Sequence, residues 1–442
     1  MTNLNDNTSE SLNALLRKRW IMWLLLVTLH LITNFHRVSF NVVADLLTAE
    51  FSLTGAGLGN LAAAYTYTYL VMQVPGGMLV DRLGPRRISV LTGGALAAGS
   101  ILLGVAPSAP VVFMGRLFLG FGGSVILINI FKFQASWFRP NEFATLSGLA
   151  LFLSSLGHLL ASTPLSISVG LIGWRGSFLF VGGFTVLVVI ICAIIIRDRS
   201  ENQPPGQAAG VSQNPNPEAA GLAGASLFKA LPKMFINNRL WILFLINTGV
   251  YGGFIVFSGT WGISYLTHVY GFGLERASYF IIPAFVGYMI GAPAIGLISD
   301  RINSRKKPAV ASFILYCLAW IILTAWPGLL PLNLLYMISF IIGLGTPANL
   351  LTFSMARESS PPGYTGLVTA MVNMGVFAGM AILQPLFGFV LDMGWEGLMI
   401  DGARIYTLEA YRLGFLICLL FGLMALVATL AYRENKPGDS ST

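Results

Sequence analysis

Long apolar runs alternate with short polar segments along the whole chain. Twelve of the runs are long enough to cross a bilayer, because a spanning helix needs about 20 mostly apolar residues. They lie at residues 20–44, 57–80, 88–106, 110–134, 144–171, 177–196, 240–267, 277–298, 308–326, 330–354, 365–391 and 412–432. The pattern predicts an all-α membrane protein with twelve transmembrane helices.

A polar segment divides the twelve runs into two sets of six. It is rich in Pro, Gly, Asn and Gln, a composition typical of a flexible linker. We therefore expect five parts: a cytoplasmic N-terminal segment at 1–19, a six-helix half at 20–196, a cytoplasmic linker at 197–239, a second six-helix half at 240–432 and a cytoplasmic tail at 433–442.

Composition supports the membrane assignment. The chain is 55% hydrophobic and 10% charged, whereas soluble domains carry about 25% charged residues. The net charge of +8 does not indicate a nucleic-acid partner, because the basic residues are spread over short loops. The three cysteines lie inside apolar runs and fit small buried side chains better than a disulfide or metal framework. No secretory signal peptide precedes the first run.

The placement of Lys and Arg predicts the orientation. With the N-terminus in the cytoplasm, cytoplasmic segments hold nineteen of these cations and outer segments four. Positive residues favour the cytoplasmic side, so we expect both termini in the cytoplasm of a bacterial inner-membrane protein. Three cations remain inside predicted spans: Arg37, Arg116 and Lys132.

The two halves carry an internal repeat. LVDRLGPRR at residues 79–87 recurs as ISDRINSRK at residues 298–306, with a shift of 219 residues between Asp81 and Asp300. WFRPNEFATLSG and MARESSPPGYTG are related by a similar shift. Repeated halves of this kind commonly place a substrate site at their interface near the bilayer midplane.

These motifs resemble those of the major facilitator superfamily. GGMLVDRLGPRR is similar to the family's loop signature between helices two and three, and GLISDRINSRKKP to its second copy between helices eight and nine. GRLFLGFGGS is similar to the fourth-helix motif with its arginine, here Arg116. FHRVSFNVVADLL resembles bacterial carriers related to organic anion symporters. The resemblance implies two pseudo-symmetric six-helix halves that work by alternating access.

The repeated loop predicts a conformational latch between the halves. An acid is stabilised at a helix N-terminus by the free N–H groups and the dipole. By resemblance, Asp81 docks at the start of helix eleven near Thr365 in the outward-open state, and Asp300 mirrors it at helix five near Ala144. The alternative is a loop that only fixes topology.

The other latch residues are cations and a glycine. Gly84 permits a tight turn, and the arginines face lipid headgroups and helix C-terminal carbonyls. We assign Arg82, Gly84, Arg86, Arg87, Arg301 and Arg305 to this device.

Polar stripes within apolar spans indicate a central site. His30, Asn34 and Arg37 fall on one face of the first helix, and such a face meets protein or water, not lipid. Stripes on other helices add Tyr65, Tyr69, His158, Asn247, Tyr251 and Trp261. By resemblance, helices one, four, seven and ten line the cavity. The aromatic residues equally fit a packed core.

Arg37 and Arg116 lie deep in spans whose apolar cores contain no Asp or Glu. A buried charge without a partner costs several kcal/mol, about 3–5 when one member of a buried pair is removed, so we expect an incoming anion to complete the site. A guanidinium holds a carboxylate through two hydrogen bonds. Alternatively, Arg116 bonds to backbone carbonyls. Lys132 lies near the cytoplasmic end of its span, and its alternative is to extend outward to the membrane surface.

The sequence departs from the organic anion symporters at two acids. His36 stands where those relatives carry an aspartate beside Arg37, and the fourth helix lacks their glutamate. Proton coupling then falls to His30, His36 or His158, each of which alternatively packs as a hydrogen-bonded core residue.

We therefore predict a secondary carrier, a monomer that moves a small organic anion with a proton or other coupling ion. An efflux carrier for a drug or neutral metabolite is the alternative transporter, and a non-transporting sensor is the alternative class. No enzyme motif, metal site or cofactor motif is present in the sequence. The substrate, the direction of transport and the coupling ion stay open.

Overall fold

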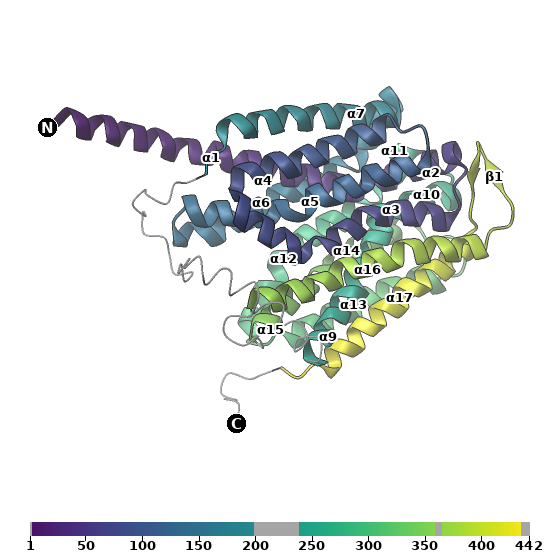
Figure 1. The fold of residues 1–442 in the computed structure, drawn as a ribbon. Helices are drawn as coiled ribbons and strands as arrows, with labels where there is room; N and C mark the ends of the chain where they lie inside the picture. The colour runs from purple at the N-terminus through teal and green to yellow at the C-terminus, as the bar shows by residue number, and fades with distance from the viewer. Residues whose placement is uncertain (1, 199–237, 359–364, 435–442) are drawn as a thin grey trace.

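The structure is a computed structural model that describes residues 2–198, 238–358 and 365–434 (Figure 1). Nearly all of these residues form long helices that run side by side, and a single two-stranded hairpin joins the last two. Most of the predicted linker, the C-terminal tail beyond residue 434 and the side chains before residue 18 lie outside the described part.

The N-terminal half contains the first six crossings. The first is α1 (Thr2–Val38) with α2 (Phe40–Phe51); the second is α3 (Gly55–Val71) with the start of α4 (Gln73–Gly104), whose remainder is the third. The fourth is α5 (Ala109–Trp137); the fifth is α6 (Pro140–Leu160) with the start of α7 (Thr163–Ile195), whose remainder is the sixth.

The C-terminal half repeats the plan. The seventh crossing joins α9 (Asn238–Ile255), η1 (Val256–Trp261) and α10 (Gly262–Tyr270); the eighth joins α11 (Leu274–Tyr279) and α12 (Ile282–Ile302). The ninth is α13 (Lys306–Ala325), and the tenth joins α14 (Leu332–Gly345), η2 (Thr346–Leu350) and α15 (Leu351–Glu358). The last two are α16 (Thr365–Met393) and α17 (Leu408–Ala431), joined by β1 (Met399–Ile400) and β2 (Ala403–Arg404).

The number of crossings agrees with the sequence prediction. Eleven helices in the described part of the chain are long and apolar enough to span a membrane. The second crossing is not among them, because it is divided at Met72 between the 17-residue α3 and the start of α4. With that crossing the fold has the twelve expected helices.

The two copies of the repeated loop share one backbone feature. Gly84 has φ 74° and turns the chain between the second and third crossings. Asn303, 219 residues later, has φ 51° at the matching place between the eighth and ninth. Glycine and asparagine adopt this left-handed region most readily, so the predicted turn at Gly84 is confirmed and recurs in the other half.

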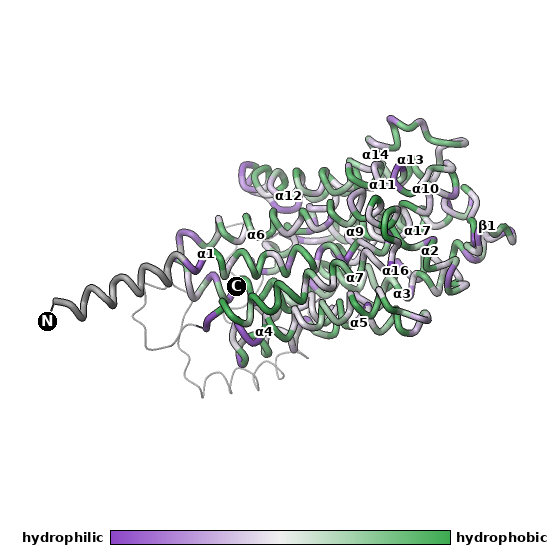
Figure 2. Tube along the Cα trace, turned by 90° about the horizontal axis from the view of Figure 1, so that it is seen from above, coloured by the Kyte–Doolittle hydropathy of each residue, from purple (hydrophilic) through white to green (hydrophobic). Residues whose placement is uncertain are grey.

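The outer surface of the bundle is apolar along its length. Leu171, Phe180 and Ile194 are each at least 70% exposed, and hydrophilic stretches gather toward the helix ends (Figure 2). Contiguous exposed apolar surface of this kind fits a lipid environment. The three cysteines are free and buried, as predicted.

The bundle has two chemically different ends. One, named here the basic end, carries Arg19, Arg86 and Arg305 and corresponds to the predicted cytoplasmic side. The other, the hairpin end, carries β1, β2, α2 and α10 (Figure 1). The halves pack against each other along α3 and α16, where Gly55 and Gly388 bring the two backbones so close that neither position has room for a Cβ atom.

Candidate functional site

Arg37 is a half-buried cation in the last turn of α1. No carboxylate pairs with it in residues 2–198, 238–358 or 365–434, and its Nε is buried without a hydrogen-bond partner. Its guanidinium carbon lies 5.5 Å from the ring centre of Tyr69 and 5.9 Å from that of Phe377. Cation–π attraction of this kind stabilises the charge only in part.

Four tyrosines from both halves lie within electrostatic range of Arg37. Tyr65 and Tyr69 come from α3, Tyr251 from α9 and Tyr288 from α12, and all four interact with its charge. Their hydroxyls are hydrogen-bond donors as well as acceptors. Arg37 therefore sits at the interface of the halves with neutral polar groups around it, an arrangement that can receive an anion.

The structure adds two residues to this site that sequence reasoning missed, Tyr288 and Phe377. Phe377 stacks on Tyr69 with ring centres 3.9 Å apart and joins α16 to α3. Tyr288 meets Tyr251 edge to face at 6.2 Å. Neither belongs to a polar stripe in the sequence, so no periodic signal identified them.

Two of the predicted histidines are buried within electrostatic range of Arg37. His30 and His158 are 4% and 7% exposed, and each interacts with the charge of Arg37. His158 also stacks on Phe285 of the other half, with ring centres 5.3 Å apart and planes within 5°. Asn34 fastens α6 to α1 by donating from Nδ2 to the Ser154 carbonyl at 3.1 Å.

Arg116 is a correction to the predicted anion site. Each of its three nitrogens already donates to a backbone carbonyl: Nε to Leu61, Nη1 to His36 at 2.8 Å and Nη2 to Ala62 at 2.6 Å. The side chain is 1% exposed. Arg116 thus ties α5 to α1 and α3, the structural alternative that the sequence had left open.

Three more predicted contacts are placed away from Arg37. Asn247 is fully buried and donates to Thr352 at 2.8 Å within its own half. Trp261 packs on Phe387 at the hairpin end. Lys132 donates to the Val80 carbonyl at 2.8 Å toward the basic end. Their side chains hold helices together, and their contact with a substrate stays a prediction.

The hairpin end joins the halves through an acid of the first crossing, Asp45. Its carboxylate accepts from Ser264 at 2.5 Å and Thr267 at 2.9 Å, and His268 Nε2 lies 3.4 Å away. Burial opposes the charge, but His268 and these hydroxyls lower the pKa of Asp45 below its ordinary value. The sequence gives no signal that pairs Asp45 with His268, because the two residues lie in different halves of the chain.

A second acid joins the halves at the same end. Asp392, at the end of α16, accepts from the backbone N–H groups of Gly55 and Ala56 at 2.7 and 2.8 Å. Arg404 and Tyr406 also donate to it, at 3.1 and 2.9 Å. The free N–H groups at the start of α3 and its dipole favour this charge.

The basic end shows no equivalent connection between described side chains. Among the side chains that the structure describes there, Asn373 Nδ2 donates to Gln73 Oε1 of the other half at 2.8 Å. Gln384 of α16 also bonds between helices, by donating to Thr260 at 2.9 Å within its own half. The halves are therefore closed together at the hairpin end.

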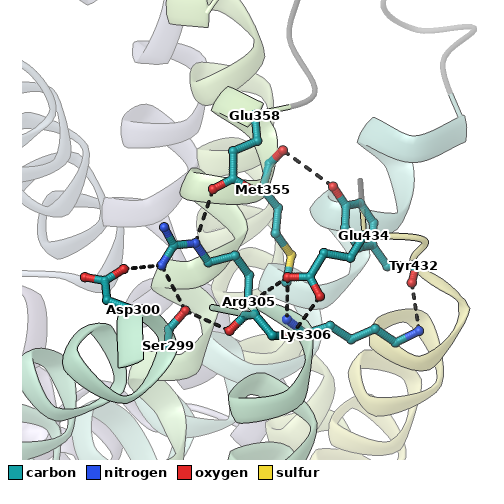
Figure 3. A network of polar contacts seen from close by, with 9 residues as sticks. Ser299, Asp300, Arg305, Lys306, Met355, Glu358, Tyr432 and Glu434 are labelled. Atoms are coloured by element: carbon teal, nitrogen blue, oxygen red, sulfur yellow. Dashed lines mark hydrogen bonds and ion pairs between the residues drawn. The ribbon is translucent and has the colours of Figure 1, made fainter. Parts of the chain in front are cut away.

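The second copy of the loop holds its own half together (Figure 3). Arg305 donates to Asp300 at 2.5 Å and to Glu358 at 3.2 Å. Glu434 accepts from the Arg305 backbone N–H and from Ser304 at 2.8 Å, which caps the start of α13. Asp300 is 68% exposed and paired within its loop, so its docking at helix five stays a prediction for the other conformation.

The first copy has the same arrangement. The backbone N–H of Arg86 donates to Asp198 at 2.9 Å, and its Nη2 donates to the Ala193 carbonyl at 2.7 Å. Arg82, Arg87 and, in the second copy, Arg301 are exposed. The side chains of Asp81 and of the start of α16 lie outside the described ones, so the Asp81 latch stays a prediction.

Comparisons with known proteins agree with this architecture. The model of the Major Facilitator Superfamily matches residues 22–287 and 280–442. A probable sulfoacetate transporter of Cupriavidus necator is 22% identical over 82% of this chain and 85% of its own. A human choline/ethanolamine transporter is 23% identical over 87% of this chain and 72% of its own. The crystal structure of a bacterial homologue of the lysosomal transporter Spinster, inward-facing and unoccupied, has TM-score 0.78 at 18% identity, covers 94% and 98% of the two chains, and shows the fold.

Proposed function

The chain belongs to the Major Facilitator Superfamily, and from that premise we propose that it carries a small organic anion, with a carboxylate as the expected group, together with a proton. Its relatives and fold are those of membrane transporters. The substrate sits between the halves at Arg37, and alternating access exposes it to one side of the membrane at a time.

The observation that carries the proposal is the isolated charge of Arg37. The other cations within the predicted spans, Arg116, Lys132 and Arg412, each donate to backbone carbonyls. A desolvated charge without a counter-charge costs several kcal/mol, about 3–5 when a buried pair loses one member. An anion that binds in a bidentate manner removes this cost and gains two charge-assisted hydrogen bonds.

The tyrosines suit the rest of such a ligand. Tyr65, Tyr69, Tyr251 and Tyr288 offer hydroxyl donors around the anion. A small acid with a second polar group can use both Arg37 and these hydroxyls. A large apolar drug gains neither, which argues against the efflux alternative.

A cationic substrate is the second candidate, because a choline/ethanolamine transporter is among the relatives and aromatic rings bind quaternary ammonium groups. In this chain, however, Arg37 itself lies beside the rings of Tyr69 and Phe377. A second cation there meets repulsion from Arg37, so the aromatic site favours an anion.

Counterflow in proteoliposomes tests the proposal. We expect labelled sulfoacetate or another small acid from a panel of succinate, gluconate and phosphate to exchange, and labelled choline not to. Arg37→Gln removes the charge and keeps a polar side chain, so exchange is expected to fall at least a hundredfold, since a charge-assisted bidentate contact contributes about 3 kcal/mol.

Arg276→Gln is the matched control, because Arg276 lies at the hairpin end over the ring of Phe272. This substitution is expected to leave exchange unchanged. Wild-type exchange of an acid by the Arg37→Gln variant contradicts the proposed role. Exchange of choline but no acid establishes the second candidate, and no exchange of any solute favours the sensor alternative.

A further inference from the structure

Two stacked pairs of aromatic rings join the halves at the candidate site. In the first, Tyr69 of α3 stacks on Phe377 of α16, with ring centres 3.9 Å apart and planes within 17°. In the second, His158 of α6 stacks on Phe285 of α12, with ring centres 5.3 Å apart and planes within 5°. None of the four residues is more than 7% exposed. Each half thus contributes one ring to each stack.

The two stacks occupy matching places in the internal repeat. Phe377 lies 219 residues after His158, the same shift that relates the two copies of the repeated loop. Tyr288 lies 219 residues after Tyr69, and Phe285 is about one turn before it. The first stack therefore joins the second and eleventh crossings, and the second joins the fifth and eighth. A contact that recurs at both equivalent places fits a role in the motion that the two halves share.

The first stack lies at one end of a tight contact between α3 and α16, which run side by side (Figure 1). Between the stack and the hairpin end, a Cβ atom on Gly59 would collide with the carbonyl oxygen of Gln384. The two backbones touch there and leave no room for water. Along α3 and α16, the interface is therefore closed from Tyr69 to the hairpin end.

The second stack also marks one end of a contact between the halves. Four residues further toward the hairpin end, Ser162 donates to the Ser278 carbonyl at 3.1 Å, and the hydroxyls of Thr163 and Ser278 lie 2.8 Å apart. Two turns toward the basic end, Leu151 lies on the same face of α6 as His158 and is 44% exposed. The halves are thus joined on the hairpin side of His158 and apart at Leu151.

Arg37 lies where these contacts begin. Its guanidinium carbon is 5.5 and 5.9 Å from the ring centres of Tyr69 and Phe377. One turn closer to the hairpin end, Asn41 is 2% exposed and donates to the Ser258 carbonyl of the other half at 2.9 Å. Arg37 itself is only half-buried. Its exposed part therefore faces the basic end, and the contacts that begin at the stacks separate it from the hairpin end.

We propose that the two stacks are the gate of the candidate site: they close it toward the hairpin end in this structure and separate when the carrier opens to that side. Stacked rings suit this task, because an apolar constriction excludes water while it is closed. They also leave little polar surface unpaired when they part. The gate does not depend on which solute is carried, so the inference goes beyond the anion transport proposed above.

Distances between spin labels at the two ends of the bundle test the gate. Labels at Val105 and Leu329 report on the hairpin end, and labels at Asn141 and Lys307 report on the basic end. All four residues are exposed, and each pair has one residue in each half. Opening of the gate is expected to lengthen the first distance and to shorten the second, because the halves rock about the site.

Phe377→Leu and Phe285→Leu each remove one stack. Each is expected to raise the ratio of hairpin-open to hairpin-closed molecules about two- to twelvefold, which is the effect of one aromatic pair. His158→Leu is expected to do the same, whereas His158→Phe keeps a ring in the stack and is expected to keep the wild-type distances. The two His158 variants test the gate if a phenylalanine variant does not fold.

Phe280→Leu is the matched control. Phe280 stacks on Tyr336 with ring centres 4.0 Å apart and planes within 20°, nearly the geometry of the first stack, but both residues belong to the C-terminal half. This variant is expected to have a lower unfolding temperature and wild-type distances at both ends.

Three results would overturn the gate. They are wild-type distances in the variants that remove a stack, a change of the same size in Phe280→Leu, and broader distances at both ends without opposite shifts, which assigns the rings to helix packing alone. None of these results bears on anion exchange, because counterflow tests the proposed function separately.

Discussion

At both ends of the bundle an acid accepts hydrogen bonds from a helix N-terminus, but the contact joins the two halves at one end and stays within a half at the other. At the hairpin end, Asp392 of one half accepts from the first N–H groups of α3 in the other half. At the basic end, Asp198 and Glu434 accept from the backbone N–H groups of Arg86 and Arg305 within their own halves. All three are acids at helix N-termini, where the dipole and free N–H groups favour them.

The difference indicates which contacts break during transport. Asp198 and Glu434 each lie three residues beyond the last crossing of their half, at matching places after α7 and α17. Each ties the end of its half to the start of a helix in the same half. The contacts of Asp45 and Asp392 join the units, so opening the hairpin end requires their separation. Rigid halves with a breakable seam suit a rocking motion.

The largest effect is expected from breaking the seam at Asp392. Asp392→Asn removes the charge that two backbone N–H groups, Arg404 and Tyr406 share. Hydrogen bonds to a charged group contribute about 1.5–3 kcal/mol, so closure is expected to weaken by about 2–3 kcal/mol. Spin labels at Val105 and Leu329, both exposed, report the opening as a longer distance.

Asp401→Asn is the control for that measurement, because Asp401 lies in the turn between the two hairpin strands and takes no part in the seam. If Asp392→Asn gives the same distance distribution as the wild type and stays closed at the hairpin end, then Asp392 does not hold the halves together.

A smaller, pH-dependent effect is expected at Asp45. Its pKa is lower in the closed seam than when it is exposed, so closure is favoured above the ordinary value of about 3.9 and is lost as pH falls through the lowered value. The distance between labels at Val105 and Leu329 is expected to lengthen from pH 7 toward pH 3. Asp45→Asn is expected to be more open by about 1 kcal/mol at pH 7 and to show a smaller pH response than the wild type.

The smallest effect on the motion is expected at the caps of the basic end. Glu434→Gln and Asp198→Asn each remove a charge from a helix start within one half, and a lost cap costs about 1 kcal/mol. We expect a lower unfolding temperature for both variants and no change in the label distance at the hairpin end. A shift in that distance as large as the one expected of Asp392→Asn contradicts the assignment of these acids to the rigid halves.

Much of the fold follows from the sequence. Twelve apolar runs predict twelve crossings because a bilayer accepts only segments that satisfy their own backbone hydrogen bonds. The repeated loop predicts two related halves, and Gly84 predicts the turn that the structure confirms at φ 74°. The division of the first and second crossings, at Ser39 and Met72, has no comparable signal.

The candidate site was predicted less completely. The polar stripe identified Arg37, His30 and Asn34 because helical spacing places them on one face. The same stripes selected Asn247 and Trp261, which bond or pack elsewhere. The spacing of polar residues predicts that a helix face is turned away from lipid. It does not distinguish a residue that contacts a ligand from one that bonds to a neighbouring helix.

The sequence by itself determined the solvent, the number of crossings and the presence of arginines in spans whose cores contain no acid, since these depend on local hydrophobicity and on which residue types occur in a span. Only the tertiary structure decided that Arg116 is held by three carbonyls while Arg37 is not. It alone decided that Asp45 meets His268 and that Asp392 meets Gly55. Such pairs lie hundreds of residues apart, and their energies depend on distances that the packing of the two halves sets.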